Sequence, residues 1–203
     1  MPRVTAAHRQ RRRQQLLTAA EHVFCRLGYT RARLQDVMDE AGVSRGGLYL
    51  YFANKEDLFR AVMAWRDEPA LGRLAKLGLG KVPVAPFLRD ASAGPDVPDE
   101  AARRWIAAAV EFGLAHRGQP AHVQQMRDRY ERFVAALVQV LAAGERRGEL
   151  HPVLPLDTVA RFWLAAQDGA VLGIVTYGET FWPRETFGPA LRLFLAASLG
   201  LPQ

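Results

Sequence analysis

The sequence predicts an all-α protein, in which a small N-terminal helix-turn-helix unit of three helices is followed by a larger helical bundle. Three observations support this fold class. Apolar residues recur at three- and four-residue spacing along most of the chain, glycine and proline interrupt these runs, and no stretch of useful length alternates apolar and polar residues as a strand would. With 203 residues, the chain can form one large domain or two small ones.

The first two helices are delimited by glycine. Apolar residues at helical spacing predict a helix over residues 12–27, and Gly28, a residue type common just beyond a helix end, follows it. The same spacing predicts a short helix over residues 34–41, which Gly42 ends.

Two capping residues are expected to start the next helices. Ser44 can cap a third helix over residues 45–52, because its hydroxyl can accept a hydrogen bond from a backbone N–H group of the first turn. Asn54 can do the same for a fourth helix, which runs from residue 55 to about residue 66.

The rest of the chain is expected to complete the larger bundle. Residues 80–98 hold four prolines and two glycines, a composition typical of a loop or inter-helix connection. Further helices are predicted over residues 99–116, 121–144, 157–177 and 184–199. We therefore divide the chain into one domain of residues 1–54 and a second of residues 55–203.

The positive charge is concentrated near the N-terminus. The net charge is +6, and residues 1–60 contain 11 Lys or Arg against 6 Asp or Glu, whereas the remaining residues contain 16 and 15. A basic end on a nearly neutral body suits a polyanion, either nucleic acid or an anionic membrane. A basic tail that only aids solubility is the alternative from charge alone.

Several classes of protein are not expected. The single cysteine, Cys25, cannot form an internal disulfide, which favours the reducing cytoplasm. No stretch approaches the roughly 18 apolar residues of a membrane span, and the basic N-terminus lacks the apolar core of a signal peptide. The five histidines show no metal-binding spacing, and no phosphate loop or nucleophile motif is present. We expect no enzyme activity, metal or cofactor.

Residues 34–55 carry the functional signal. Two short helices joined by a four-residue turn form the layout of a helix-turn-helix. In the turn, the small Ala41 lets the helices approach, Gly42 can adopt the left-handed conformation, and Val43 can fill the corner. The third helix begins with Arg45, Gly46 and Gly47. The two glycines have no side chain, so the backbone N–H groups of this turn can approach phosphates and base edges.

The motif resembles the tetracycline-repressor (TetR) family of one-component regulators. The likeness is carried by the Gly28-Tyr29 pair, by residues 41–52 and by residues 54–58, and it covers about residues 12–63. The remainder resembles the family in its layout of helices and in the turn at residues 143–150. The resemblance implies a DNA-binding domain in residues 1–54 and a ligand-binding and dimerisation domain in residues 55–203.

The resemblance also assigns DNA-contacting residues by position. The third helix would face the major groove, with Tyr51 and Lys55 on phosphates and Gln35 contacting the operator from the second helix. The full expected set is Arg33, Gln35, Ser44, Arg45, Gly46, Gly47, Tyr49, Leu50, Tyr51 and Lys55.

This chain departs from the family pattern at several positions. Ala32 and Arg33 stand where threonine or serine is usual, so the hydroxyl cap of the second helix is missing, and Arg33 can supply a longer charged contact instead. Gly47 often is threonine in the family. Leu50 replaces a common aromatic residue or histidine and is a candidate contact to a thymine methyl group. Leu48 and Phe52 are expected to be core residues, and an alternative interpretation places Tyr49 in the core as well.

Two helices of the body are expected to form a dimer interface. Small and apolar residues on residues 157–177 recur at helical spacing and would let another helix come close. The alternative is an internal core of one chain. The expected interface residues are Phe162, Ala166, Gly169, Ala170, Gly173, Tyr177, Leu191, Phe194 and Leu195.

Aromatic residues of the body are candidates for a ligand cavity. Apolar walls with a few polar groups are typical of ligand pockets, although an aromatic stripe at helical spacing is also typical of ordinary core. The candidate residues are Trp105, Phe112, His116, Met126, Tyr130, Trp163 and Gln167.

The leading hypothesis is a homodimeric transcriptional repressor that a small, largely apolar effector releases from a palindromic operator in double-stranded DNA, with no role for a membrane. A DNA-binding activator, an architectural DNA-binding protein without a ligand, and a helical enzyme or binding protein for a hydrophobic molecule are the alternatives. Preference for an operator over random DNA separates them, since a specific regulator discriminates by roughly 10³-fold or more.

Overall fold

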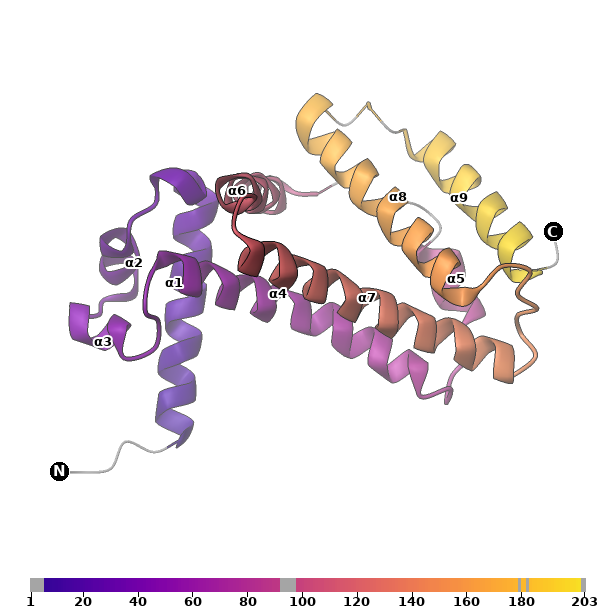
Figure 1. Cartoon of the computed structure of the whole chain (residues 1–203), viewed down its shortest axis with the longest axis horizontal. Helices are drawn as coiled ribbons and strands as arrows, with labels where there is room; N and C mark the ends of the chain where they lie inside the picture. Colours follow the sequence, from indigo (N-terminus) through magenta and orange to yellow (C-terminus); the bar gives the residue numbers. More distant parts are fainter. Residues whose placement is uncertain (1–5, 92–97, 179, 182, 202–203) are drawn as a thin grey trace. The chain divides into compact units, whose positions relative to one another are not determined.

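The computed structural model describes residues 6–91, 98–178, 180–181 and 183–201, and over these residues the chain is helical without strands, as predicted (Figure 1). The helices are α1 (Ala6–Arg31), α2 (Leu34–Ala41), α3 (Arg45–Tyr49), α4 (Lys55–Gly78), α5 (Ala85–Ala91), α6 (Glu100–His116), α7 (Pro120–Arg146), α8 (Leu156–Tyr177) and α9 (Arg184–Leu199).

The chain folds into two compact units. The first contains residues 1–68 and 99–117, and the second contains residues 69–98 and 118–203. This division differs from the expected boundary after residue 54, because the first part of α4 and the whole of α6 belong with the helix-turn-helix. A functional division at residue 54 stays a prediction.

Helix α1 is longer than its apolar pattern predicted. It begins at Ala6 rather than at residue 12, so Arg9 and the arginines at 11–13 lie on the helix. The backbone at Gly28 is not helical (φ 74°, ψ 170°), which confirms the predicted break there, although one more helical turn follows. A positive φ of this size is readily adopted by glycine alone.

The core of the first unit is built from α1, α2, α3, α4 and α6. The predicted core residues Leu48 and Phe52 are buried, which confirms that prediction. Rings from three helices meet edge to face, with centroids 4.8 Å apart for Phe24 and Phe59 and 4.9 Å apart for Tyr29 and Phe112. Such pairs add to the free energy gained by burying apolar surface.

Helix α4 continues well beyond the predicted end at about residue 66, with Pro69 inside it. Its first half packs in the first unit through Leu58, Phe59 and neighbouring residues, whereas Leu74 and Leu77 in its second half pack against the apolar core of the second unit. Long-range packing of this kind supports a helix that local signals do not predict.

The expected loop at residues 80–98 is wrong for part of its length, because α5 lies within it. Pro86 falls in the first turn, where a missing N–H group costs nothing. Val84 and Leu88 are spaced one turn apart and are buried against α7 and α8, so tertiary burial stabilises this short helix. Residues 92–97 of the expected loop lie outside the described residues.

The second unit has a single apolar core contributed by its helices. Valines and leucines of α5 and α7 pack there with Trp163 of α8 and with Leu191 and Leu195 of α9. Outside this core, Arg161 joins α8 to α7 through two hydrogen bonds to the carboxylate of Glu131 (2.8 and 2.7 Å). Apolar burial therefore fixes the unit, and charged pairs lie at its surface.

Candidate nucleic-acid interface

The turn between α2 and α3 has the geometry that the sequence predicts. Gly42 adopts the left-handed conformation (φ 61°, ψ 43°), and its N–H group donates to the carbonyl of Asp39. The N–H group of Val43 donates to the carbonyl of Met38 (3.0 Å), so the end of α2 is closed by backbone hydrogen bonds. Gln15 of α1 donates to the carbonyl of Ala41 (2.8 Å) and ties the turn to the first helix.

The start of α2 is capped without the hydroxyl that the family pattern uses. The carboxylate of Asp36 accepts a hydrogen bond from the backbone N–H group of Arg33 (2.8 Å). This contact is half of a capping box, and it satisfies a donor at the helix N-terminus. The Arg33 side chain is exposed and is not needed for the cap. On the same helix, exposed Gln35 donates to Asp39 (2.7 Å).

Helix α3 begins as predicted and ends early. The hydroxyl of Ser44 accepts a hydrogen bond from the N–H group of Gly47 (3.3 Å), which confirms Ser44 as the cap. The helix ends at Tyr49 rather than at Phe52, and residues 50–51 form a turn. Two glycines among five residues give a weak helix. Burial of Phe52 and the cap of α4 by Asn54 then fix where the chain turns.

One face of the α3 region is exposed. Tyr49 is 44% exposed and Leu50 is 78% exposed, whereas the side chain of Leu48 is fully buried. The guanidinium carbon of Arg45 lies 5.5 Å from the centre of the Tyr49 ring. The interpretation of Tyr49 as a core residue is therefore wrong. The side chains of Arg45, Tyr49 and Leu50 therefore lie outside the core and can contact another molecule.

The remaining expected contacts differ in accessibility. Gly46 is exposed and a Cβ atom there would meet no other atom within 4 Å, whereas Gly47 lies against Ser44 and Val43. Tyr51 is half-buried, and its ring centroid lies 6.4 Å from that of Phe52. The contacts of these residues to bases or phosphates stay predictions.

Lys55 is used inside the first unit. Its Nζ donates to three carbonyl oxygens, those of Tyr29 (2.8 Å), Thr30 (3.3 Å) and Ala32 (2.9 Å). Burial lowers the pKa of the amine, and the charge of Glu111 raises it. An ammonium group has three N–H donors, and these carbonyls can accept all three. Lys55 thus holds the end of α1 and the residue that follows it, and its expected phosphate contact stays a prediction.

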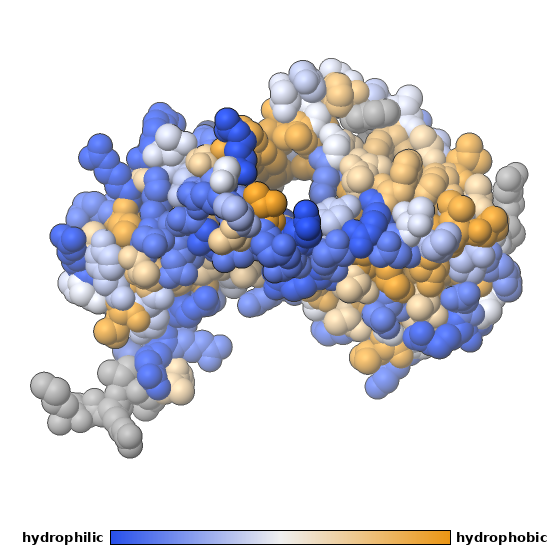
Figure 2. Space-filling view, in the orientation of Figure 1, coloured by the Kyte–Doolittle hydropathy of each residue, from blue (hydrophilic) through white to orange (hydrophobic). Residues whose placement is uncertain are grey.

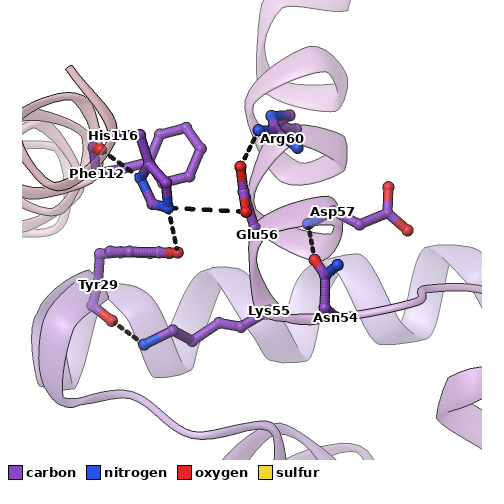
Figure 3. A network of polar contacts seen from close by, with 8 residues as sticks. All are labelled: Tyr29, Asn54, Lys55, Glu56, Asp57, Arg60, Phe112 and His116. Carbon is purple, nitrogen blue, oxygen red and sulfur yellow. Dashed lines mark hydrogen bonds and ion pairs between the residues drawn. The ribbon is translucent and has the colours of Figure 1, made fainter. Parts of the chain in front are cut away.

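A buried polar network, which sequence reasoning missed, joins α1, α4 and α6 (Figure 3). The imidazole of His116 lies between the Tyr29 hydroxyl (3.4 Å) and the Glu56 carboxylate (3.8 Å), and its Nδ1 lies 2.8 Å from the Phe112 carbonyl oxygen. Arg60 pairs with Glu56 on the other side. Burial, followed by the charge of Glu56, raises the pKa of Tyr29.

Glu111 of α6 makes a second connection to the segment before α2. Its carboxylate accepts a hydrogen bond from the N–H group of Thr30 (2.9 Å). A Cβ atom at Gly28 would lie 2.7 Å from this carboxylate, so glycine is needed for the close approach as well as for its positive φ. Glu111 and Lys55 together hold residues 28–32, and no local pattern identifies either one for this task.

The expected ligand residues fall into both compact units. Trp105, Phe112 and His116 lie in the first unit, where the Trp105 ring stacks on Phe59 at 5.0 Å. In the second unit, Tyr130 donates to the Arg161 carbonyl (3.2 Å), Trp163 packs against Phe87 at 5.6 Å, and Met126 is partly buried. Gln167 donates to the Ala91 carbonyl (3.2 Å), while its Oε1 is buried without a partner among the described residues. A ligand role for these side chains stays a prediction.

A small cavity of about 160 Å³ lies between α7 and α8 and includes Tyr130 of the expected ligand residues. Its other lining residues are Arg129, Phe133, Leu164 and Asp168.

An apolar groove of about 450 Å³ lies between α8 and α9. Figure 2 shows hydrophobic side chains over these two helices. Six expected dimer residues line the groove: Phe162, Ala166, Gly169, Ala170, Leu191 and Phe194. Phe162 is 53% exposed and Tyr177 is 69% exposed.

Four of the expected dimer residues, two of which also line the groove, are already buried within one chain. Ala170, Gly173, Leu191 and Leu195 have little remaining surface, and Gly173 packs directly under Phe181. For these four residues, the internal core accounts for the small-residue pattern. A contact with a second copy would use the exposed members.

The described residues hold neither a cluster of metal-ligating side chains nor a helix that could span a membrane. Nowhere in the described part of the chain do three or more His, Cys, Asp or Glu side chains gather as they would around a metal ion. Among the helices that these residues form, none has the length and apolar character of a membrane span.

Comparison with known proteins agrees with this geometry. Residues 16–62 match the bacterial regulatory proteins of the tetR family, and residues 96–181 match the tetracyclin repressor-like C-terminal domain. The uncharacterised regulator YfiR of Bacillus subtilis is 32% identical over 185 residues, which cover 88% of this chain and 87% of YfiR. The repressor AcnR of Corynebacterium diphtheriae is 26% identical over 181 residues, covering 89% of this chain and 90% of AcnR.

The fold also matches solved structures. The triclosan complex of SmeT, the repressor of the Stenotrophomonas maltophilia efflux pump SmeDEF, superimposes with a TM-score of 0.73 and 20% identity. The alignment covers 93% of this chain and 92% of that one.

Proposed function

Because the chain belongs to the tetR family of bacterial transcriptional regulators, we propose that it is a homodimeric repressor that leaves a palindromic operator when a small molecule binds. The observation that carries the proposal is the exposed face of α3, where Arg45, Tyr49 and Leu50 stand clear of a fully buried Leu48. A helix end with this exposure can enter a major groove roughly 12 Å wide. Proteins of this family are DNA-binding regulators rather than enzymes, and we place this one in the cytoplasm with the DNA.

The proposed DNA contacts divide into two kinds. Arg45, Gly46, Gly47, Tyr49 and Leu50 would face base edges, with Leu50 against a thymine methyl group. Arg33, Gln35, Ser44 and Tyr51 would contact phosphates and position the helix. Lys55 belongs to the second kind only if it exchanges its carbonyl partners for a phosphate when DNA binds.

The groove between α8 and α9 supports pairing with a second copy. An apolar groove with the exposed side chains of Phe162 and Phe181 is an unfavourable surface to leave in water. Two copies related by a twofold axis would present two α3 helices, which is what a palindromic site requires.

A small-molecule effector is supported by a similar protein. SmeT, a repressor, was crystallised with triclosan. An effector can release DNA only if it binds the two conformations with different affinity, by about 1–3 kcal/mol for a typical coupling.

The first experiment titrates the purified protein against duplex DNA from beside its own gene, with excess random competitor and at two salt concentrations. Binding that resists competitor by roughly 10³-fold or more, with a salt slope of several phosphates, supports a specific regulator. Binding that competitor abolishes argues for an architectural protein, and no binding to any duplex in a genome-wide selection overturns the proposal.

Variants of α3 then test the assigned residues. Arg45→Ala and Tyr49→Ala each should weaken operator binding by about 1–3 kcal/mol, because both side chains are exposed and are not needed for folding. Arg73→Ala, an exposed arginine on α4, is the matched control. Equal affinities for all three variants would show that α3 does not read the operator.

A further inference from the structure

The cavity between α7 and α8 has the chemistry of a cation site. Two of its walls are the aromatic rings of Tyr130 and Phe133, and Leu164 adds an apolar wall. Asp168 supplies a carboxylate that remains open to solvent on one side, yet burial by its neighbours raises its pKa. Aromatic faces together with a partly desolvated carboxylate favour a positive charge.

A positive side chain of the protein already occupies this environment. The guanidinium carbon of Arg129 lies 5.6 Å from the centre of the Phe133 ring, and its charge lowers the pKa of Asp168. The neighbouring Arg161 is bound to Glu131 and Asp157 instead, so it belongs to a different set of charges. Arg129 therefore places a positive charge near Asp168 and beside one of the rings.

The charged side chains of the cavity, those of Asp168 and Arg129, differ in how freely they can move. Asp168 has a short side chain on α8 and cannot leave the cavity without moving the helix. Arg129 has a long side chain at the surface of α7, and it recovers hydration and rotamer freedom when it swings into water. The fixed charge of the cavity is thus negative, and the exchangeable charge is positive.

The cavity volume of about 160 Å³ limits what can enter. An apolar cavity of about 150 Å³ in another protein admits benzene. A quaternary ammonium group fits, with an attached ring left at the open side of the cavity, whereas a large planar molecule does not enter.

We propose that this cavity binds a small organic cation, which displaces Arg129 from Phe133 and Asp168 and acts as the effector of the regulator. The effector part rests on the proposed function, and the binding part does not. Tyr130, whose hydroxyl is held by the Arg161 carbonyl, would form a fixed wall of the site.

Binding is tested on the purified full chain without DNA by isothermal titration calorimetry with benzyltrimethylammonium, with benzyl alcohol as the neutral aromatic control. The wild type should bind the cation and not the alcohol. Asp168→Asn and Phe133→Leu should each weaken cation binding about tenfold or more, because each removes a partner of the charge. Asp128→Asn, an exposed carboxylate on α7 that accepts a hydrogen bond from Gln124, is the matched control.

Arg129→Gln gives the sharpest outcome. Loss of the resident cation should tighten benzyltrimethylammonium binding several-fold, whereas Arg132→Gln, an exposed arginine on the same helix, should leave it unchanged. Circular dichroism melting of each variant shows that it is folded. Absence of cation binding by the folded wild type, or weaker binding by Arg129→Gln, overturns the site.

The effector role has a separate readout. Benzyltrimethylammonium should release the operator from the wild type and not from Asp168→Asn, at concentrations that saturate the site. Cation binding without operator release overturns the effector role alone. Failure of the protein to bind any operator in the absence of the cation instead contradicts the proposed function and leaves the binding result to be judged by calorimetry.

Discussion

The two compact units join their helices by different kinds of interaction. In the first unit, half-buried Lys55 and Glu111 hold the segment before α2, and buried His116 bridges Tyr29 and Glu56. In the second unit, charged pairs lie at the surface, and an apolar groove is left open between α8 and α9. The first unit is complete as a single chain, whereas the second has a surface suited to a further partner.

The two units should also respond differently to substitutions. A buried polar contact is costly to lose, because its partner remains buried without a hydrogen bond. An exposed apolar surface is costly only until it is covered. Changes at the groove should therefore act on assembly, and changes at the polar contacts should act on stability.

The largest effect is expected at the groove. Phe162→Glu places a charge on a half-exposed lining residue and should convert a dimer to a monomer in sedimentation velocity experiments. Operator affinity should fall by about 10²-fold or more, since binding of the second half-site is no longer intramolecular. Leu114→Glu, at an exposed apolar residue of α6, should change neither property. A variant that remains dimeric would place the interface elsewhere.

The second largest effect is expected for Lys55→Met. Three carbonyl oxygens lose a charged donor, so we expect a loss of about 2–4 kcal/mol in the free energy of unfolding measured with guanidinium chloride. Lys76→Met, an exposed lysine of the same helix, is the control. Unchanged stability together with a salt slope of operator binding reduced by about 0.9 would instead support the phosphate contact.

Gly28→Ala should have a smaller effect on the same segment. The positive φ disfavours a side chain, and the new Cβ atom would meet the carboxylate of Glu111. We expect a loss of about 1–3 kcal/mol in thermal or chemical unfolding. Gly113→Ala, at an open position within α6, should instead gain up to about 1 kcal/mol. If both substitutions were equally tolerated, the tight approach of α6 to residue 28 would be wrong.

The surface pair of the second unit should contribute least. Hydrogen bonding to Arg161 lowers the pKa of Glu131 below its unfolded value. A carboxyl group of this kind stabilises the protein above its unfolded pKa, and the contribution is lost as the pH falls through the lower folded pKa. Glu131→Gln should lower the melting temperature slightly at neutral pH and not in acid, and added salt should reduce the difference. A difference that grew in acid would contradict this sign.

Much of the first unit could be predicted from local patterns. The glycine turn, the Ser44 cap and the burial of Leu48 and Phe52 depend on residues within a few positions of one another, and all were confirmed. Helix ends were predicted less well where packing decided them. Helix α3 ended early because Phe52 is buried, and α5 formed within an expected loop because Val84 and Leu88 are buried.

The sequence by itself determined the all-α class, the position of the helix-turn-helix and the turn that shapes it, because short-range hydrogen bonds and apolar spacing encode these features. Only the tertiary structure decided which charges point inward. Lys55 meets carbonyls 23 to 26 residues away, and Glu111 meets an N–H group 81 residues away. Such contacts depend on how the helices pack. For this reason Lys55, which the sequence pattern assigns to a DNA phosphate, is bound by carbonyl groups of the protein itself.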